Sequence, residues 1–416
     1  MDYLAPMSGL DLGLTIGAMI LLTGQLPAIA ILLSRLIQGA NRLRPLTPQS
    51  PTGDLLGAVS VVVPTLNEEA RIQPCLDGLT RQSYELREVV VVDSRSVDGT
   101  VDRVKTMQQS DPRFRVITDD PLPPDWVGRP WALHNGFLHS SEGSRWILGI
   151  DADTRPQPGL IASLVQTAEA QGYDLVSLAP QFVLKGAAEW WLQPALLITL
   201  LYRFGAAGAP PENPERVMAN GQCFLIRRSL LAQLGGYSSA RRSFCDDVTL
   251  ARHAARQGAR VGFLDGANLL QVRMYEGVQE TWREWGRSLD LKDATSAVQK
   301  WGDLLFLGAV QGLPFPICLG VGILALTGHL GLLMQSPVVA GAIALNVVLL
   351  AIRFALLLAI QTAYSRTDSP GFWAYWLSPL ADPLAVLRIL LSSIQTPTQW
   401  RGRSYAIASQ GAPPAR

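Results

Sequence analysis

The residues best suited to chemistry are polar side chains that follow three short apolar segments. Segments 58–63, 89–92 and 145–150 are followed, in that order, by Pro64, Thr65, Asn67 and Glu68, by Asp93 and Ser94, and by Asp151 and Asp153. If the segments are parallel strands, their carboxyl ends meet at one sheet edge, where such sheets bind ligands. Turns and helix caps also favour aspartate, so one such residue alone would predict little. Three converging strand ends predict an acidic site.

The pair Asp151 and Asp153 is suited to holding a metal ion. Carboxylate oxygens are the ligands of Mg²⁺ and Mn²⁺, which usually keep several waters and also bind substrate phosphates. A divalent ion at a diphosphate would neutralise the charge on a leaving group. The sequence therefore predicts a divalent metal beside a phosphate-bearing substrate.

A second acidic pair, Asp246 and Asp247, begins a predicted helix that runs towards Gly258. One interpretation is that either residue only caps this helix, because aspartate is favoured at helix N-termini. The other is that the pair supplies a general base, since a carboxylate can take a proton from a hydroxyl as that hydroxyl attacks a carbon centre.

Several other kinds of chemistry are excluded by motifs that the sequence lacks. The first strand is not followed by Gly-x-Gly-x-x-Gly, and neither Gly-x-x-x-x-Gly-Lys-Ser/Thr nor Gly-x-Ser-x-Gly occurs. The four cysteines have no Cys-x-x-Cys spacing, which argues against a zinc site or a disulfide framework. Lys and Arg (35) nearly balance Asp and Glu (34), so the chain has no basic field for nucleic acid.

The elements that would position these residues alternate between strand and helix. Continuous apolar runs at 58–63, 89–92, 115–118 and 145–150 indicate strands covered on both faces. Helical stretches are predicted between and after them, at about 68–82, 98–110, 130–141 and 156–171, the last beginning at Pro156. This order predicts an α/β fold with a doubly wound, mostly parallel sheet.

The apolar residues of the chain are concentrated near its ends. Only 17% of the residues are charged, and residues 12–34 carry no charge. Between Asp303 and Arg353 the only ionisable residue is His329, so 304–352 is long enough for two membrane spans with a break at residues 335–337. A cleaved signal peptide is the alternative at 12–34, but Asp2 and Asp11 replace the usual basic start. Residues 371–396 are interrupted by proline and charge, which predicts a kinked span or two interfacial helices.

Four regions follow from this pattern: an N-terminal transmembrane helix at 1–45, a water-soluble domain at 46–300, C-terminal transmembrane or interfacial helices at 301–400, and a tail at 401–416. Arg35, Arg42 and Arg44 flank the first span, so the positive-inside rule places the N-terminus outside and the domain in the cytoplasm. Arg401 and Arg403 favour an even number of later crossings. We expect two full spans and an interfacial segment at 371–396.

The motifs together resemble a known family. The sequence Val-Val-Pro-Thr-Leu-Asn-Glu-Glu, Val-Val-Asp-Ser-x-Ser-x-Asp-Gly-Thr, Asp-Ala-Asp and Asp-Asp-Val-Thr-Leu-Ala-Arg, in this order over about 57–290, is similar to family 2 glycosyltransferases of the GT-A fold. The segments 128–133 and 219–228 also resemble family blocks. The flanking spans are similar to those of ceramide glucosyltransferases and hopanoid-associated enzymes. The nearest likeness, including residues 400–405, is to bacterial carotenoid 2'-O-glycosyltransferases.

The resemblance implies a role for each matching position. It implies donor binding by Pro64, Thr65, Asn67, Glu68, Asp93, Ser94, Arg129, Asp151, Arg283 and Arg287. It implies metal binding (Mn²⁺ or Mg²⁺) by Asp153 with Asp151, a catalytic base at Asp247, and an acceptor side formed by Asp246, Gly221, Gln222, Trp190 and Trp191. Position 129 is Arg where the family often has Lys. The Gln-x-x-Arg-Trp motif of processive members is absent, which argues against a polymer-extruding synthase, and Arg283 or Arg287 is expected to reach the diphosphate instead.

The apolar segment 190–202 is either a buried core helix or a helix that enters the membrane interface, where a lipid acceptor would reach Asp247.

The resemblance implies inverting transfer of one sugar from a UDP- or GDP-sugar to a hydroxyl of a membrane-dissolved lipid. The expected acceptor is a carotenoid, at the 2'-hydroxyl of a myxol-type xanthophyll. The alternatives are a hopanoid or sphingolipid acceptor, a polysaccharide synthase, or a non-catalytic membrane scaffold. The expected location is a bacterial inner or internal photosynthetic membrane, with several crossings and the site on the cytoplasmic side.

Overall fold

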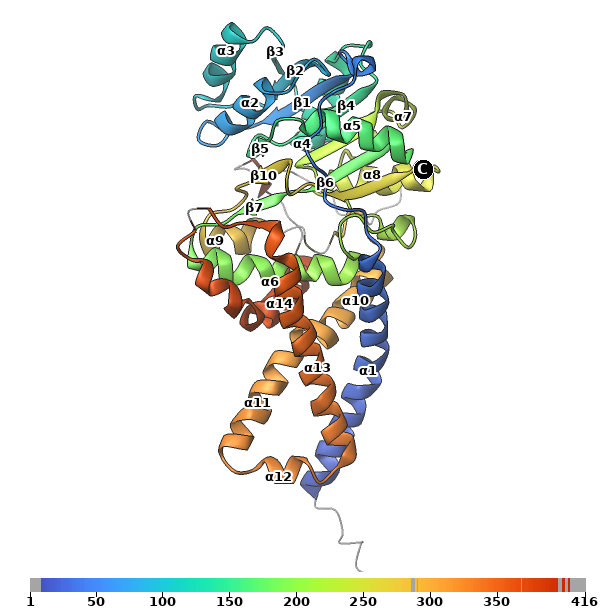
Figure 1. The fold of residues 1–416 in the computed structure, drawn as a ribbon, viewed down its shortest axis with the longest axis vertical. Coiled ribbons are helices and arrows are strands. Elements are labelled where there is room, and N and C mark those ends of the chain that lie inside the picture. The colour runs from blue at the N-terminus through green and yellow to red at the C-terminus, as the bar shows by residue number, and fades with distance from the viewer. Residues whose placement is uncertain are drawn as a thin grey trace, which may run out of the picture.

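A seven-stranded sheet forms the centre of the protein (Figure 1). The computed structural model describes residues 9–285, 289, 291–367, 369–395, 399–400 and 403–404. The sheet order is β3-β2-β1-β4-β8-β6-β9. Its strands are β1 (Val59–Thr65), β2 (Leu86–Asp93), β3 (Phe114–Thr118), β4 (Trp146–Ile150), β6 (Leu175–Ala179), β8 (Cys223–Arg227) and β9 (Val261–Asp265). The four strands predicted from apolar runs are present, and the predicted α/β class is confirmed.

The sheet is mostly parallel, as predicted, with one reversed strand. β1 pairs in parallel with β2 and β4, whereas β8 runs antiparallel to both β4 and β6. Alternate residues of a strand point to opposite faces. In β1 this places Val61 in the apolar cluster that contains Leu76 and Leu164, and Val62 in the cluster that contains Leu133. Both faces are thus covered, which explains the continuous apolar runs.

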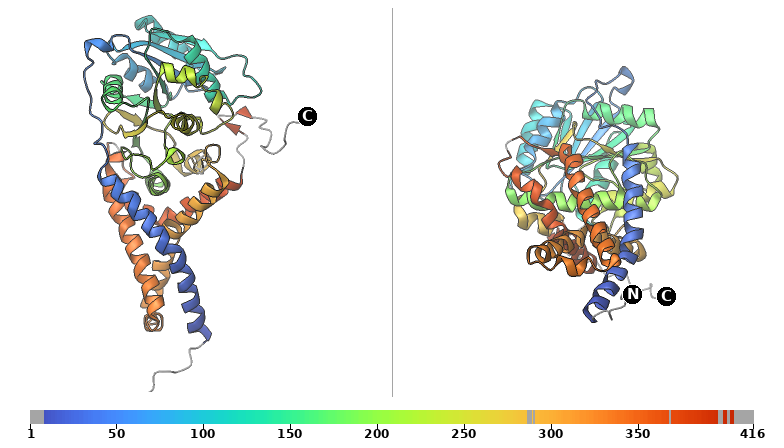
Figure 2. Two further views of the ribbon diagram at one scale, coloured as in Figure 1. Left: turned by 90° about the vertical axis from the view of Figure 1, so that its right-hand side faces the viewer. Right: turned by 60° about the horizontal axis from the view of Figure 1, so that its bottom comes forward.

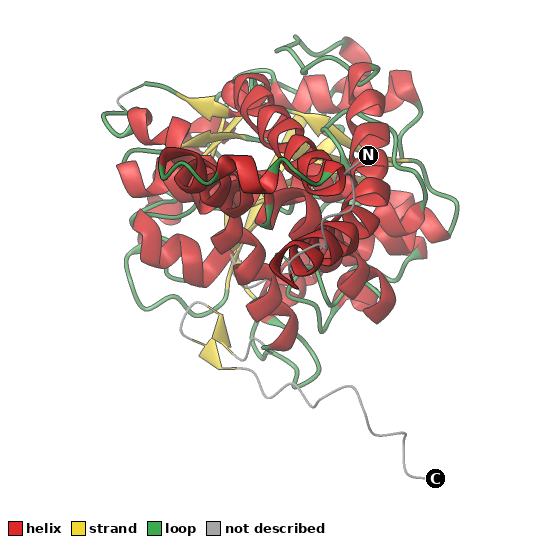
Figure 3. Ribbon diagram, turned by 90° about the horizontal axis from the view of Figure 1, so that it is seen from below, coloured by secondary structure: helices red, strands yellow, loops and turns green. Residues whose placement is uncertain are grey.

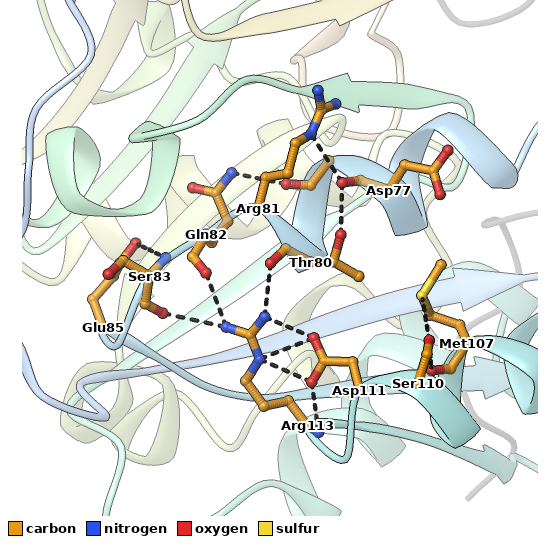
Figure 4. A network of polar contacts seen from close by, with 11 residues as sticks. Asp77, Thr80, Arg81, Gln82, Ser83, Glu85, Met107, Ser110, Asp111 and Arg113 are labelled. Atoms are coloured by element: carbon orange, nitrogen blue, oxygen red, sulfur yellow. Dashed lines mark hydrogen bonds and ion pairs between the residues drawn. The ribbon is translucent and has the colours of Figure 1, made fainter.

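Helices cover the two faces of the sheet. They are α2 (Gln73–Thr80), α3 (Thr100–Ser110), α4 (Gly128–His139), α5 (Leu160–Gln171), α7 (Arg228–Gln233) and α8 (Asp246–Arg256), with 3-10 turns η1 (Gly53–Leu55), η2 (Pro214–Arg216) and η3 (Ser238–Ala240). Viewed from below, helices surround the strands (Figure 3). The C-terminus of α2 is fastened by Arg113, which donates to the carbonyl oxygens of Thr80 and Gln82 at 2.9 Å each and pairs with Asp111 (Figure 4).

Two predicted helix boundaries are wrong. The helix expected to begin at Pro156 begins at Leu160, because Thr154–Pro156 forms strand β5 and pairs with β10 (Leu270–Val272). β5 belongs to a second sheet of order β11-β7-β10-β5, with β7 (Gln181–Val183) and β11 (Tyr364–Ser365). The helix expected from residue 68 begins at Gln73, because the amides of Glu68 and Glu69 donate to the side chains of Thr100 and Asp98.

Long apolar helices extend away from the sheet (Figures 1 and 2). They are α1 (Gly9–Ala40), α10 (Ala297–Leu307), which continues through the π-helix η6 (Gly308–Gly312) into α11 (Pro314–Leu326), the short α12 (Leu330–Leu333), and α13 (Pro337–Ala359). α13 packs against both α1 and α11, α11 diverges from α13 towards its far end, and α12 joins the far ends of α11 and α13. Within the described residues, four segments are long and apolar enough to cross a membrane: Leu12–Ala40, Ala297–Leu326, Pro337–Ala363 and Phe372–Ile394.

Apolar helices occur where the spans were predicted, with shifted ends. Phe372–Ile394, expected to lie in the interface, is also long and apolar enough to cross, so the number of crossings stays a prediction. The helix around 12–34 is present, and the break between the two later helices occupies residues 327–336, slightly longer than expected. Segment 371–396 forms the 3-10 helix η8 (Phe372–Ala381) and α14 (Asp382–Ile394). The remaining elements are α6 (Ala187–Phe204), α9 (Gly277–Glu280), the π-helix η4 (Thr281–Trp285), η7 (Ile360–Ala363), β12 (Gln399–Trp400) and β13 (Arg403–Ser404). Residues 1–8 and 405–416, with Arg401 and Gly402, lie outside the described residues.

Helix α6 runs across the junction between the sheet domain and the long helices (Figure 1). Its buried side packs in an apolar cluster with η8, α14 and α10, through residues such as Trp190, Leu196, Tyr375 and Phe306. The helix is held in place by polar contacts as well, since Gln193 donates to the Thr281 hydroxyl at 3.0 Å. α6 therefore connects the sheet domain to α10 and to the pair η8 and α14.

Candidate active site

One cavity of about 470 Å³ lies at the carboxyl ends of β1 and β4, between the sheet edge and α6. Ten of the residues predicted from sequence line it: Pro64, Glu68, Arg129, Asp151, Asp153, Gly221, Gln222, Asp246, Asp247 and Arg283. The two acidic pairs, which are far apart in the sequence, are thus brought to the same space. Of the three strand ends predicted to converge, those of β1 and β4 meet at the cavity, whereas the residues that follow β2 do not line it.

The guanidinium group of Arg129 joins the two acidic pairs. Its Nε and Nη2 atoms donate to Asp151 Oδ1 at 3.0 and 2.8 Å, and its Nη1 donates to Asp246 Oδ2. Nη2 also donates to the carbonyl oxygen of Gly221 at 2.8 Å. Burial lowers the pKa of Arg129, but the charges of Asp151, Asp246 and Asp247 more than offset this and raise the pKa well above its ordinary value. Arg129 is therefore a fixed positive charge at the centre of the site.

Asp247 is the second residue of α8 and lines the cavity. Its carboxylate accepts hydrogen bonds from the Gly221 amide at 2.6 Å and from the Val248 amide at 2.8 Å. Burial and the charge of Asp246 raise the pKa of Asp247 to about 6, although Arg129 and the two amides lower it. A carboxylate with a raised pKa is a stronger base than an exposed one and is still ionised at neutral pH.

Asp151 and Asp153 sit on a tight turn after β4. The Thr154 hydroxyl donates to the carbonyl oxygen of Asp151 at 2.7 Å, which closes the turn, and both aspartates line the cavity. No group of three or more His, Cys, Asp or Glu residues suited to a metal ion occurs in the described part of the chain. Two carboxylates, one of them partly engaged by Arg129, fit an ion that takes its other ligands from water and phosphate. The donor set is therefore compatible with Mg²⁺ or Mn²⁺.

Four of the predicted donor-binding residues, Thr65, Asn67, Asp93 and Ser94, do not line the cavity. The Asp93 carboxylate instead accepts hydrogen bonds from the Thr65 hydroxyl at 3.1 Å and from the amide and hydroxyl of Ser96 at 2.9 and 2.6 Å. Asn67 Oδ1 accepts from the amide of Val97 at 2.9 Å. These bonds fasten the loop after β2 to the end of β1, so they shape the edge of the site. Their contact with a nucleotide stays a prediction.

The tryptophans predicted on the acceptor side do not line the cavity either. Trp190 is fully buried, and its ring packs against Tyr364, Phe372 and Tyr375 at centroid distances of 5.0 to 5.8 Å. Trp191, next along α6, is also absent from the lining. The same helix contributes Leu197 and Leu200 to the cavity instead. The interpretation of segment 190–202 as a buried core helix therefore holds for the face of α6 that carries Trp190. The face that carries Leu197 and Leu200 lines the cavity instead.

The arginines predicted near the diphosphate are only partly placed. Arg283 lies on the π-helix η4 at the cavity, where its Nε donates to Glu284 at 2.8 Å, and its side chain is 69% exposed. Arg287 lies outside the described residues. Arg388 of α14 supports η4, because its Nε donates to the Trp282 carbonyl oxygen at 2.6 Å.

The sequence interpretation missed a group of cavity residues that come from distant segments: Arg71, Phe244, Met274, Tyr275, Glu280, Glu284 and Trp285. Arg71 Nη2 donates to Glu280 Oε1 at 3.0 Å, which joins the loop after β1 to α9. Residues 274–285 reach the cavity because β10 pairs with β5 and brings the following segment across the site. Arg71 lies two residues after the motif that ends at Glu69, and Phe244, Glu284 and Trp285 lie within two residues of predicted site residues. Met274 and Tyr275 have no such neighbour in the sequence.

The chain is similar to known glycosyltransferases over part of its length. Residues 60–235 match the family model described as glycosyl transferase family 2. The protein is similar to the 4,4'-diaponeurosporenoate glycosyltransferase of Staphylococcus haemolyticus (strain JCSC1435), with 23% identity over 57% of this chain and 62% of the relative. The protein of the same name in Staphylococcus aureus (strain USA300) is 24% identical over 56% of this chain and 60% of the relative. The matched region thus spans about three fifths of these relatives.

Solved structures show a weaker overall likeness. The mannosyltransferase PcManGT of Pyrobaculum calidifontis, in complex with GDP-Man and Mn²⁺, aligns with 89% of this chain and 99% of its own, with a TM-score of 0.49 and 20% identity. The glucosyl-3-phosphoglycerate synthase of Mycobacterium tuberculosis aligns with 56% of this chain and 79% of its own, with a TM-score of 0.39 and 24% identity.

Proposed function

We propose that the protein transfers one sugar from a nucleotide-sugar donor to a hydroxyl group of a lipid that stays in the membrane, and the match of residues 60–235 to the glycosyl transferase family 2 model supports this. The observation that carries the proposal is a single cavity with two kinds of wall. Asp151, Asp153 and Asp247 lie in the same space as Leu197 and Leu200 of α6, the helix that borders the long apolar helices.

The donor side of the proposal uses the sheet edge. Asp153, with the remaining oxygen of Asp151, would hold a divalent ion, and Pro64 and Glu68 would border the nucleotide. A bound Mg²⁺ or Mn²⁺ would neutralise charge on the leaving diphosphate. Arg129 keeps Asp151 in place, because two of its nitrogen atoms donate to one oxygen of that carboxylate. We propose a UDP- or GDP-sugar as donor.

The chemical step follows from the position of Asp247. Its carboxylate takes the proton of the acceptor hydroxyl while the hydroxyl oxygen forms a bond to the anomeric carbon. The bond from that carbon to the diphosphate breaks in the same displacement, so the configuration inverts and the nucleoside diphosphate leaves with the electron pair. The Gly221 amide, at 2.6 Å from the carboxylate, fixes the direction of the accepting oxygen. No covalent intermediate is needed.

The acceptor proposed first is a carotenoid, at the 2'-hydroxyl of a myxol-type xanthophyll. The names of the two staphylococcal relatives support a carotenoid-type acceptor. A hopanoid or a sphingolipid would use the same chemistry and differ only in its apolar body. A non-catalytic scaffold is disfavoured, because the buried carboxylate of Asp246, beside the half-buried Asp247, is costly to keep without a role.

We further propose that three segments cross the membrane: α1, α10 with α11, and α13. η8 and α14 would lie in the interface beside α6, with Trp373 and Trp376 exposed at headgroup level. Arg35 would mark the cytoplasmic end of α1, which places the cavity on the cytoplasmic side of a bacterial inner or internal photosynthetic membrane. Because two crossings follow α1, namely α10 with α11 and then α13, the C-terminus would lie on the same side as the cavity.

The test of this function is mass spectrometry of total lipids and pigments from cells with and without the gene. Loss of a glycosylated carotenoid from the deletion strain supports the proposal. An altered hopanoid or sphingolipid with unchanged carotenoids assigns the acceptor to the second class. Unchanged glycolipids and pigments in a strain that normally expresses the gene contradict a transferase function.

A further inference from the structure

We propose that the face of α6 that carries Leu197 and Leu200 is the seat of the acceptor's apolar body, and that the cavity selects a neutral lipid alcohol over a lipid phosphate. This inference rests on the proposed function and deepens it, because it names the class of acceptor and the residues that hold it.

The first argument is the division of α6 into two faces. Leu197 and Leu200 are three residues apart, so they lie on one side of the helix, and both line the cavity half-buried. Leu196 and Ile198, on the other sides, are fully buried in the core. Phe182 and Trp285 also line the cavity, with ring centroids 5.8 Å apart, and belong to the same apolar cluster as the two leucines. Two leucines and two aromatic rings of one cluster form an apolar wall of the cavity.

The second argument is that this wall is held in a fixed place. Gln193 of α6 donates to the Tyr275 carbonyl oxygen at 3.3 Å as well as to Thr281, and Gln311 of η6 donates to the Ala195 carbonyl oxygen at 3.0 Å. The helix is thus tied both to the segment that carries Trp285 and to the helices proposed to cross the membrane. A wall fixed on both sides limits the width of a molecule that enters.

The third argument is charge. Seven acidic side chains and three arginines line the cavity in the described part of the chain. One of the arginines, Arg129, is already paired with Asp151 and Asp246. A nucleotide-sugar diphosphate together with one divalent ion adds no net charge. A lipid phosphate at the acceptor end would therefore meet an excess of carboxylates near Asp247, whereas a neutral alcohol would not.

Binding of two matched probes tests the selection by charge. Retinol is an apolar polyene alcohol with its own fluorescence, and retinyl phosphate differs from it only in the headgroup. Fluorescence anisotropy of each, with the full-length protein in a neutral detergent and protein-free micelles as the blank, gives the two dissociation constants. We expect retinol to bind at least tenfold more tightly at pH 7.5. Equal binding, tighter binding of the phosphate, or no binding of either probe overturns the proposal.

A pair of matched variants tests the wall. Leu200→Trp should weaken retinol binding at least tenfold and leave the dissociation constant of the nucleotide donor within twofold. Leu201→Trp, at the adjacent half-buried position that does not line the cavity, should change neither. If either Trp variant fails to fold, Leu200→Ala and Leu201→Ala replace them, with a weaker effect expected only at 200. Equal effects at both positions overturn the assignment.

These measurements do not require turnover. Selective binding of retinol with an effect at Leu200, in a protein that transfers no sugar to any lipid, would leave the inference standing and remove the proposed function. Sugar transfer to a lipid at a rate that Leu200→Trp does not change would support the proposed function and remove this inference.

Discussion

Asp151 and Asp246 are bridged by one guanidinium group, that of Arg129, which donates to both carboxylates. Asp151 follows β4 and Asp246 begins α8, so the bridge couples the proposed metal-binding turn to the helix that carries Asp247. The backbone of Gly221 extends this coupling to Asp247. The Gly221 carbonyl oxygen accepts a hydrogen bond from Arg129, and the Gly221 amide donates one to Asp247. The Arg129 guanidinium group therefore stabilises both the proposed donor side and the proposed acceptor side of the cavity.

The rate should depend on the ionisation of Asp247. Its pKa is raised to about 6, so the base is ionised above that pH and protonated below it. We expect kcat/KM for the acceptor to be level at neutral pH and to fall about tenfold per pH unit below about 6. The measurement is initial rates from pH 5 to pH 8 at saturating donor. A profile that stays level down to pH 5 would contradict a base with this pKa.

Replacing Arg129 should move that profile. Arg129 lowers the pKa of Asp247, so Arg129→Gln should raise it and shift the acid limb to higher pH. The maximum rate should also fall, because the Gly221 peptide loses the bond that fixes it. Arg242→Gln is a matched control, since Arg242 forms an exposed ion pair with Asp125 and lies outside the cavity. An unshifted acid limb in Arg129→Gln would show that this charge does not act on the base.

Asp153 should govern the response to metal ions. Asp153→Ala should raise the Mn²⁺ or Mg²⁺ concentration needed for half-maximal donor binding by tenfold or more, because one of two proposed carboxylate ligands is lost. Isothermal titration with the donor at several metal concentrations measures this directly. Asp77→Ala, on α2 and outside the cavity, serves as the control. An unchanged metal dependence in Asp153→Ala would remove that role.

The close packing of α4 on β1 makes a separate prediction about stability. A Cβ atom at Gly136 would lie 2.1 Å from a methyl carbon of Val62, which is buried on β1. Gly136→Ala should therefore destabilise the domain by about 1–3 kcal/mol. Gly53→Ala is the control, because a Cβ there meets no atom within 4 Å. Thermal unfolding of the detergent-solubilised protein should show a lower midpoint for the first variant only.

The sequence predicts the sheet well because its central strands are buried on both faces and so consist mainly of runs of apolar residues. It predicts the acidic cluster for the same reason, since Asp151 and Asp153 follow such a run directly. Strand β5 is missed because Thr154–Pro156 has no run of its own and exists only through its pairing with β10. A proline at its end made the segment look like a helix start.

The part of the cavity formed by α6 and residues 274–285 depends on tertiary contacts, which no local sequence pattern predicts. Trp190 and Leu200 lie on the same apolar helix, and only the packing of η8 against α6 decides that the first is buried and the second faces the cavity. Arg71 and Glu280 meet because residues 274–285 fold back over the site. Side chains placed by long-range packing carry no periodic signal in the sequence.

The most direct test of the central claim is transfer of labelled sugar into lipid by the purified protein. Wild-type and Asp247→Asn proteins are incubated in vesicles that contain a hydroxylated carotenoid, with Mn²⁺ and radiolabelled UDP- or GDP-sugars, and the organic phase is counted. The account predicts label in the carotenoid fraction with the wild type, and at least a thousandfold lower rate with Asp247→Asn at nearly unchanged donor affinity. Comparable labelling by Asp247→Asn would contradict the assignment of the base. Its absence with every donor and with carotenoid, hopanoid and sphingolipid acceptors would contradict the function.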